Sequence, residues 1–259
     1  MNLLFIGDVV GKGGREAVRQ LVPELRREFN CQFVVVNAEN AAAGSGLTSG
    51  CAKELLEVAD VLTTGDHVWD QRGFDAEIDR LDRVLRPANL QKGQPGRGWG
   101  VFRNPAGGEV AVINLQGKVF MRESAYNPFE TVEEILAHEL PKTVNTILVD
   151  FHAEATSEKL AMGYLLDGRV TAVLGTHTHV PTADALVLPG GTARQTDVGM
   201  TGPIESVLGV RAELVIKKQI SKMPVRFDFA DGPCKLDCIL FDIDEKTGLT
   251  RSTERFSLR

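Results

Sequence analysis

Residues 170–179 read VTAVLGTHTH, an apolar run that ends in a glycine and in two histidines one residue apart. The apolar run has the length and composition of a buried strand, which Gly175 would end. Side chains alternate along an extended chain, so His177 and His179 are expected to point the same way into the loop beyond the strand. Histidine is the commonest metal ligand, yet an isolated His-x-His pair is more often a surface or packed feature. The rest of the chain has to decide between these two interpretations.

Four other apolar runs end in the same way. They predict strands at residues 2–6, 32–36, 59–63 and 145–149. The polar side chains just beyond these strands are Asp8, Glu39 with Asn40, Asp66 with His67, and His152. Helices predicted at residues 16–29, 49–58, 71–81 and from 156 onward alternate with the strands, which indicates parallel βα units. Because the carboxyl ends of parallel strands meet at one edge of a sheet, we expect all of these side chains to lie near His177 and His179.

Each of these residues also has a structural interpretation. Asp8 alone is equally well explained as a helix or turn cap, and Glu39 alone as a solvated loop acid. Asp197, in the polar loop 196–203, is expected either to orient a ligand histidine or to form a turn. For Lys118, Arg122 and Tyr126, in a long loop predicted at residues 115–129, a solvated or interfacial role is favoured over contact with a substrate. It is the repetition over successive units that favours ligands, because capping alone would not place them all at one edge.

Composition narrows the class of protein. The chain has 259 residues, 43% of them hydrophobic and 25% charged, which predicts one domain over residues 1–259. Its formal net charge of −6 argues against a broad basic surface for duplex nucleic acid. No apolar run approaches about 18 residues, so no membrane span is expected. The apolar start is too short for a signal peptide and the four cysteines form no disulfide framework, so we expect a cytoplasmic protein.

The second half of the chain is predicted to be rich in β-structure. A hairpin is expected from strands at residues 100–103 and 109–114 around a turn at 104–108. A helix at residues 131–139, opened by Thr131 with Glu134 as its capping partner, separates this hairpin from the strand at 145–149. Further strands are predicted at residues 184–188, 192–196, 213–216, 225–229 and 234–242. Parallel βα units followed by β-rich sequence indicate an α/β fold.

The number of strand-end ligands indicates the chemistry. At least seven carboxylate, amide and imidazole groups are too many for one tetrahedral zinc ion, but they suit two cations that share a carboxylate. A two-metal centre clamps the attacking and leaving oxygens of an in-line displacement at phosphorus. The sequence therefore predicts hydrolysis of a phosphate ester.

The order of these motifs resembles the calcineurin-like metallophosphoesterases, and within them the YmdB-type bacterial subfamily. The resemblance rests on residues 7–8, 37–44, 65–70, 151–159, 175–179 and 196–203, which together span most of the chain. It implies a four-layer α/β/β/α sandwich of the metallophosphoesterase type. It also implies a phosphodiesterase whose substrates are 2′,3′-cyclic nucleotides.

The resemblance further implies a role for each strand-end residue. The first metal would be held by Asp8, Glu39, Asn40 and His179, with Glu39 bridging to the second. The second metal would be completed by Asp66, His152 and His177. His67 would be the general acid, and a hydroxide bridging the metals would attack phosphorus. The two ions are expected to be iron or manganese, with zinc and magnesium as alternatives.

Asp66 departs from the pattern, since the family usually has Gly-Asn-His where this chain has Gly-Asp-His. Three carboxylates beside two divalent cations leave a formal charge of +1, so phosphate would be held less strongly unless one ion is trivalent iron. Two other functions stay open at this point, a phosphomonoesterase and a metal-containing regulatory binding protein with weak turnover. A homo-oligomer is also left open.

Overall fold

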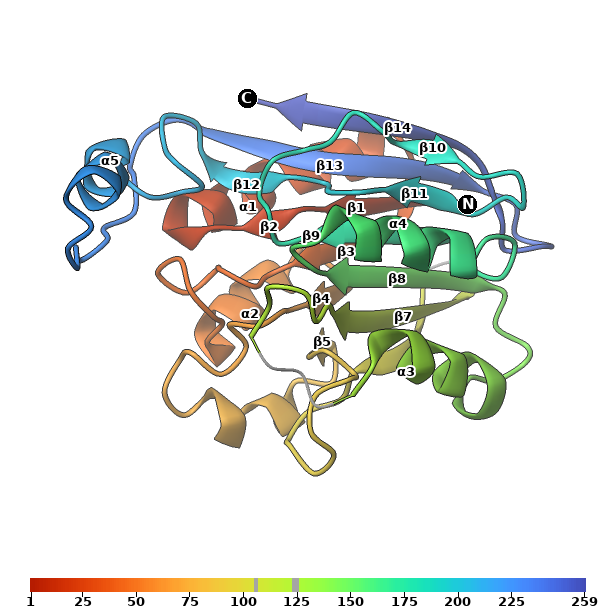
Figure 1. Ribbon diagram of the computed structural model, residues 1–259. Helices are drawn as coiled ribbons and strands as arrows, with labels where there is room; N and C mark the ends of the chain where they lie inside the picture. Colours follow the sequence, from red (N-terminus) through yellow and green to blue (C-terminus); the bar gives the residue numbers. More distant parts are fainter. Residues whose placement is uncertain (105–106, 123–125) are drawn as a thin grey trace.

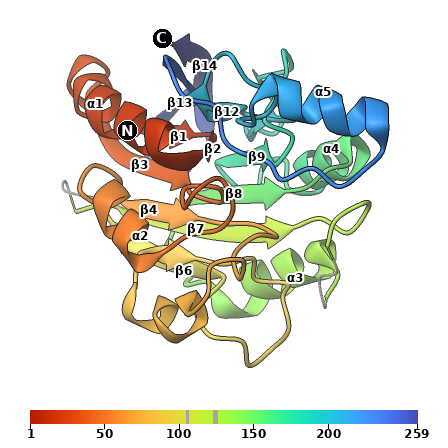
Figure 2. The same cartoon turned by 90° about the vertical axis from the view of Figure 1, so that its left-hand side faces the viewer.

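A computed structural model of the protein describes residues 1–104, 107–122 and 126–259. Two β-sheets lie face to face, and helices cover their outer faces (Figures 1 and 2). The α/β/β/α sandwich expected from the sequence is therefore confirmed. Residues 105–106 of the predicted turn and residues 123–125 of the predicted loop at 115–129 lie outside the described residues.

The first sheet contains the N-terminal units. In spatial order its strands are β2 (Asp8–Val9), β12 (Met200–Pro203), β13 (Cys234–Ile243), β1 (Asn2–Ile6), β3 (Cys31–Asn37), β4 (Val61–Thr63) and β5 (Val84–Leu85), with β14 (Thr250–Leu258) paired to β13. β1, β3, β4 and β5 run parallel, whereas β13 runs antiparallel to β1. The predicted strand at residues 2–6 is thus observed with the same bounds.

The second sheet contains the strands that end at the remaining histidines. Its order is β10 (Leu186–Val187), β11 (Ala193–Gln195), β9 (Ala172–Thr176), β8 (Thr146–His152), β7 (Glu109–Gln116) and β6 (Trp99–Arg103). β7, β8, β9 and β11 run parallel, so their carboxyl ends lie on one side. The arrowheads of β7 and β8 point to the left in Figure 1, and Figure 2 turns that side toward the viewer.

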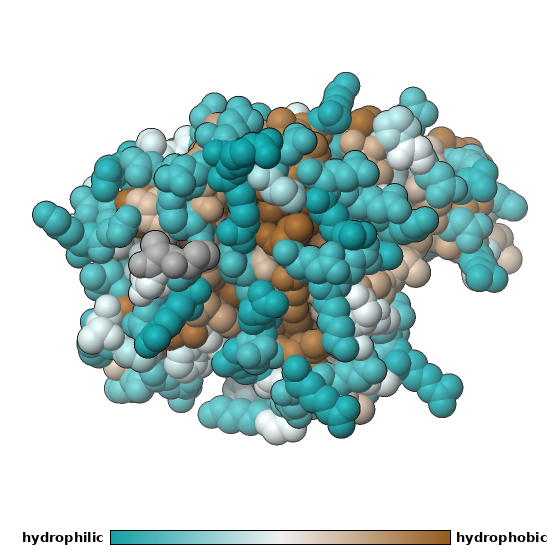
Figure 3. Space-filling model, turned by 180° about the vertical axis from the view of Figure 1, so that it is seen from behind, coloured by the Kyte–Doolittle hydropathy of each residue, from teal (hydrophilic) through white to brown (hydrophobic). Residues whose placement is uncertain are grey.

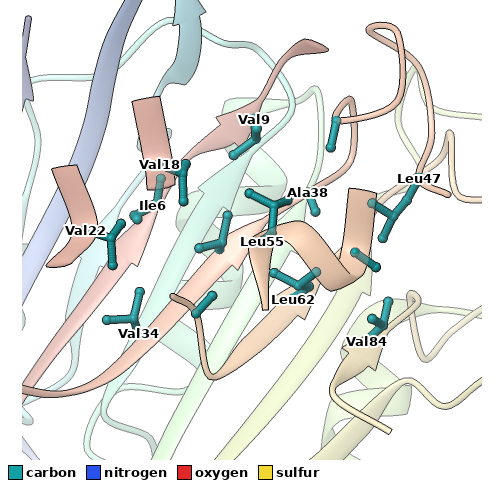
Figure 4. Packing of buried hydrophobic residues seen from close by; sticks show 14 of the residues in the cluster. Ile6, Val9, Val18, Val22, Val34, Ala38, Leu47, Leu55, Leu62 and Val84 are labelled. Carbon is teal, nitrogen blue, oxygen red and sulfur yellow. The ribbon is translucent and has the colours of Figure 1, made fainter. Parts of the chain in front are cut away.

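Alternation along the strands builds the layers. In β1, Leu4 and Ile6 face the helices α1 (Gly11–Glu28) and α2 (Ser49–Leu55), whose apolar sides complete this core (Figure 4). Leu3 and Phe5 point the other way, into the core between the sheets. Each phenylalanine that is fully buried in this way contributes roughly 1.5–3 kcal/mol.

The second sheet is covered by two further helices. A third core joins it to α3 (Pro128–Glu134), which continues as a π turn at Ile135–Glu139, and to α4 (Thr156–Leu165). α3 begins earlier than predicted, because Asn127 caps it and Pro128 occupies its first turn. The predicted cap formed by Thr131 and Glu134 is therefore wrong. α1 likewise begins before residue 16, since Gly14 is buried inside its first turns.

The predicted helix at residues 71–81 is wrong. The structure has two short 3₁₀ turns there, Phe74–Ala76 and Ile78–Arg80. Gly73 adopts a left-handed conformation with φ 84°, which interrupts a helix. Asp70, which precedes these turns, bonds Ser45 and Arg122.

The predicted strands at residues 213–216 and 225–229 are also wrong. Residues 213–216 belong to α5 (Ala212–Ser221), and residue 229 forms only an isolated bridge. A short apolar run fits a strand or a helix equally well, so length and context decide. α5 has no buried residue and stands clear of the layers at the left of Figure 1. The loop predicted at residues 196–203 contains β12 at its end.

No helix in the described ranges is long and apolar enough to cross a membrane. The face of the molecule in Figure 3 carries mostly hydrophilic side chains, with hydrophobic ones visible between them.

Candidate metal centre

The strand ends bring all eight predicted site residues to one place. They come from β2 and from the loops or ends that follow β3, β4, β8 and β9, and they are Asp8, Glu39, Asn40, Asp66, His67, His152, His177 and His179. The closeness of β4 and β8 requires a residue without a side chain before Asp66. A Cβ on Gly65 would lie 2.2 Å from the His152 ring.

One group of donor atoms surrounds His152. Its Nε2 lies 3.2 Å from Asp66 Oδ1, 3.1 Å from His177 Nδ1 and 3.6 Å from Glu39 Oε1. His177 Nδ1 is itself 3.6 Å from Asp66 Oδ1. The donor atoms of Asp66, His152 and His177 lie close enough together to suit a cation, with a Glu39 oxygen beside His152.

A second group lies around His179. Its Nδ1 donates to the Leu208 carbonyl oxygen at 3.3 Å, which leaves Nε2 facing the site. Nε2 lies 3.1 Å from the Asn40 side-chain amide and 3.9 Å from Asp8 Oδ1. An amide turned about its terminal bond presents oxygen in place of nitrogen, so Asn40 can offer a ligand oxygen here.

Two buried carboxylate oxygens at the site are orphaned. Asp8 Oδ1 and Glu39 Oε2 have no hydrogen-bond partner within the described parts of the chain. Burial, followed by the charge of Asp197, raises the pKa of Asp8 to about 8, and burial, followed by the charge of Asp66, raises that of Glu39 well above its ordinary value. A buried carboxylate oxygen without a hydrogen-bond partner destabilises the fold. A cation between Asp8 Oδ1 and Glu39 Oε2 would remove that cost. The residues therefore fit a metal centre.

Asp66 differs from the other two acids. Burial acts to raise its pKa, but the interaction with His152 and the charges of the neighbouring histidines lower it below the ordinary value. Burial lowers the pKa of His152 to about 3, so its ring is neutral, as a metal ligand must be.

Behind His152 lies a polar chain that the sequence did not reveal. His152 Nδ1 is 2.9 Å from Thr176 Oγ1, which donates to Asp150 Oδ1 at 2.7 Å. Asp150 Oδ2 also accepts from Thr63 and Asn37. This chain fixes the ring so that Nε2 faces the site, as outer partners of metal-bound histidines do. The sequence signal for this polar chain is Asp150, an acid that directly follows the predicted apolar strand at residues 145–149.

The His-Thr-His segment is not extended, contrary to expectation. His177 and His179 have φ values of 101° and 64°, so their rings do not point the same way but reach different partners. Asp197 holds the residue between them by accepting from Thr178 N at 3.0 Å and Thr178 Oγ1 at 2.8 Å. Buried Lys159 donates to the same Asp197 oxygen at 2.8 Å. Asp197 Oδ2 therefore contacts Thr178 and Lys159, while its Oδ1 accepts from the Gly199 N–H at 2.9 Å, as in a turn.

Thr178→Val is expected to loosen this segment. The change removes one hydrogen bond to a charged acceptor, which contributes about 1.5–3 kcal/mol to the free energy of unfolding. Chemical denaturation of the metal-free protein measures the loss. Thr131→Val, which removes an exposed hydroxyl bonded to Asn127, is the control and should stay within about 0.5 kcal/mol of the unmodified chain. Equal stability of the two variants would contradict the role given to Asp197.

His67 has a defined orientation at the edge of the site. Its Nδ1 lies 2.8 Å from Ser45 Oγ and 3.1 Å from Asp70 Oδ2, and Ser45 Oγ donates to the same Asp70 oxygen at 2.6 Å. Its backbone N–H donates to Glu39 Oε1 at 2.5 Å. Nε2 is directed to the Asp66 side, 3.6 Å from Asp66 Oδ2. The sequence did not indicate that Ser45, in a loop of small residues, orients the His67 ring.

Two more charged residues border the site. Arg122, for which a solvated role was favoured, lies against Asp66 and Asp70. Glu154 Oε2 lies 3.3 Å from His177 Nε2. Tyr126 instead stacks beneath Lys92.

The chain is similar to known proteins over nearly its whole length. A family model described as "YmdB-like protein" matches residues 4–256. The chain is 46% identical to a 2′,3′-cyclic-nucleotide 2′-phosphodiesterase of Bacillus subtilis (strain 168), over 98% of this chain and 96% of that one.

Two solved structures superpose closely on the fold. A hypothetical protein from Thermus thermophilus gives a TM-score of 0.91 with 36% identity, covering 99% of this chain and 98% of its own. A protein from Mycoplasma pneumoniae described as a novel phosphatase gives 0.92 with 33% identity, covering 100% and 93%.

Proposed function

The chain belongs to the YmdB-like family and is an enzyme that hydrolyses phosphate esters, and from that premise we propose that it cleaves 2′,3′-cyclic nucleotides with two metal ions. The observation that carries the proposal is the pair of orphaned oxygens, Asp8 Oδ1 and Glu39 Oε2, among converging histidine nitrogens. The name of the Bacillus subtilis relative supports the choice of a cyclic nucleotide.

The ligands fall into two sets that share Glu39. We assign Asp8, Asn40 and His179 to one ion and Asp66, His152 and His177 to the other. Two divalent cations held by these residues would acidify a water and neutralise charge on the phosphoryl oxygens. Iron or manganese is proposed, and an iron(III) ion beside a divalent one would suit the third carboxylate, with zinc and magnesium as alternatives.

His67 is proposed as the general acid. Ser45 and Asp70 hold Nδ1, so Nε2 is the nitrogen that can carry a proton to the substrate. As an oxygen from water forms a new bond to phosphorus and the bond from phosphorus to a ribose oxygen breaks, that proton passes to the departing ribose oxygen. Burial lowers the pKa of His67 below its ordinary value, and the charges of Asp66 and Asp70, which favour the protonated ring, offset only part of this effect.

Asp66→Asn is expected to keep two metals and to tighten phosphate binding. The amide oxygen can still bind a cation, while one negative charge is removed from the site. Elemental analysis counts the metals, and inhibition by inorganic phosphate measures the affinity. Loss of one metal from this variant would contradict the prediction.

The proposed substrate class is tested with a panel of 2′,3′-cyclic AMP, an aryl phosphodiester and an aryl phosphomonoester. We expect the cyclic nucleotide to have the highest kcat/KM with the Mn²⁺-loaded protein. Preference for the monoester would indicate a phosphomonoesterase instead. Bound metal without turnover on any substrate would indicate a regulatory binding protein.

A further inference from the structure

Arg122 brings a positive charge to the edge of the metal centre. Its Nε lies 3.4 Å from Asp66 Oδ2, and its Nη1 donates to the Asp66 carbonyl oxygen at 3.2 Å. The Asp66 side chain is 6% exposed, whereas that of Arg122 is 51% exposed. The guanidinium therefore lies between the buried Asp66 carboxylate and solvent.

Asp70 fixes Arg122 in this place. Nη1 donates to Asp70 Oδ1 at 2.6 Å and Nη2 to Asp70 Oδ2 at 3.3 Å, so the pairing is two-pronged. The hydrogen bond to Asp70 raises the pKa of Arg122 above its ordinary value. Asp70 is itself held by Ser45. Because both Nη atoms of Arg122 are hydrogen-bonded to Asp70, the guanidinium is held in one position, unlike the arginine of most surface ion pairs.

The two oxygens of Asp66 have different partners. Oδ1 faces the nitrogens of His152 and His177, while Oδ2 faces Arg122 and His67. A carboxylate can serve both sides at once. If residue 66 were asparagine and its oxygen faced the histidines, its N–H₂ group would face the N–H groups of Arg122. Two hydrogen-bond donors would then face each other. The residue at position 66 and the arginine at position 122 are thus matched to each other.

A second nearby cation, Lys159, adds no net charge. Lys159 is buried and paired with Asp197 at 2.8 Å. We propose that Arg122 is a substrate-affinity residue: it offsets the charge of Asp66 and so determines how strongly the metal-loaded site holds a phosphate group. This inference rests on the proposed function in that the site binds phosphate.

The test uses inorganic phosphate as the probe and calorimetric titration of the Mn²⁺-loaded protein as the readout. Arg122→Ala should weaken phosphate binding about fivefold, which is what one unit charge contributes at about 4 Å in water-like surroundings. Asp66→Asn in the Arg122→Ala background should restore the affinity of the unmodified chain, because one negative charge is removed with one positive charge. A merely structural role of Arg122 would not be rescued in this way.

Arg169→Ala is the matched control, since Arg169 forms a two-pronged pair with Glu133 and is similarly exposed. It should bind phosphate as the unmodified chain does. Arg122→Gln, which retains more of the side chain, should repeat the effect of Arg122→Ala with two Mn²⁺ ions per chain. Unchanged phosphate affinity, loss of Mn²⁺ from either Arg122 variant, or a double variant no tighter than Arg122→Ala would overturn the inference. If the unmodified chain binds phosphate but does not hydrolyse cyclic nucleotides, the proposed function fails while the phosphate titrations still decide this inference.

Discussion

Glu39→Gln is expected to abolish metal binding and hydrolysis while making the metal-free protein more stable. Glu39 is the carboxylate proposed to contact both ions, so we expect kcat/KM on 2′,3′-cyclic AMP to fall by at least about 10³-fold, within the range that charge stabilisation at an active site supplies. In the metal-free protein the same group is a buried acid with one orphaned oxygen. Replacing it with a neutral isostere should raise the free energy of unfolding by about 1–3 kcal/mol.

The raised pKa of Glu39 also predicts the direction in which the free energy of unfolding changes with pH. Burial raises the pKa of Glu39 above its ordinary value of 4.5, so the folded metal-free chain binds more protons than the unfolded chain. Its stability should therefore fall as pH rises above about 4.5, and Glu39→Gln should reduce that fall. Denaturation curves between pH 4 and pH 8 measure both slopes. Glu24→Gln, at an exposed position of α1, is the control. A variant that keeps both metals and its activity would contradict the bridging role.

His67→Ala is expected to lower turnover in a way that depends on the leaving group. Proton transfer to a leaving oxygen contributes typically 10²–10⁴-fold, so kcat on 2′,3′-cyclic AMP should fall by about that factor. The nitrophenolate group of a nitrophenyl diester leaves without needing a proton. Turnover of that substrate should therefore fall by less than about tenfold. The variant should retain both metals, because no ligand is removed.

Steady-state rates on the two substrates, with metal content measured in parallel, test the acid role. His138→Ala, at an exposed histidine in the π turn that follows α3, should leave both rates unchanged. An equal loss on both substrates would show that His67 positions the phosphate and does not protonate the leaving group.

The convergence of the ligands could be predicted because it depends on a simple regularity. Parallel strands end at one edge, and five apolar runs in this chain are each followed by an acid, amide or histidine. His177 and Asp8 are 169 residues apart in sequence, yet the His177 N–H donates to Asp8 Oδ2 at 3.1 Å. The strand pattern alone was enough to expect that proximity.

The parts that could not be predicted depend on conformations and contacts that a strand pattern does not encode. The left-handed backbone at His177 and His179 is unusual for residues other than glycine, and Asp197 on another strand end maintains it. Likewise Asp150, Ser45 and Arg122 act on the site through long-range hydrogen bonds. The helix expected at residues 71–81 does not form because Gly73 takes a left-handed conformation, which the sequence pattern does not encode.

The two-metal centre is tested most directly by titrating the metal-free protein with Mn²⁺ while recording its turnover of 2′,3′-cyclic AMP. We expect no turnover without metal, and a rate that rises until two ions are bound per chain and then stays constant. A plateau at one ion per chain, or full turnover by the metal-free protein, would contradict the assignment of Asp8, Glu39 and the strand-end histidines to a pair of cations.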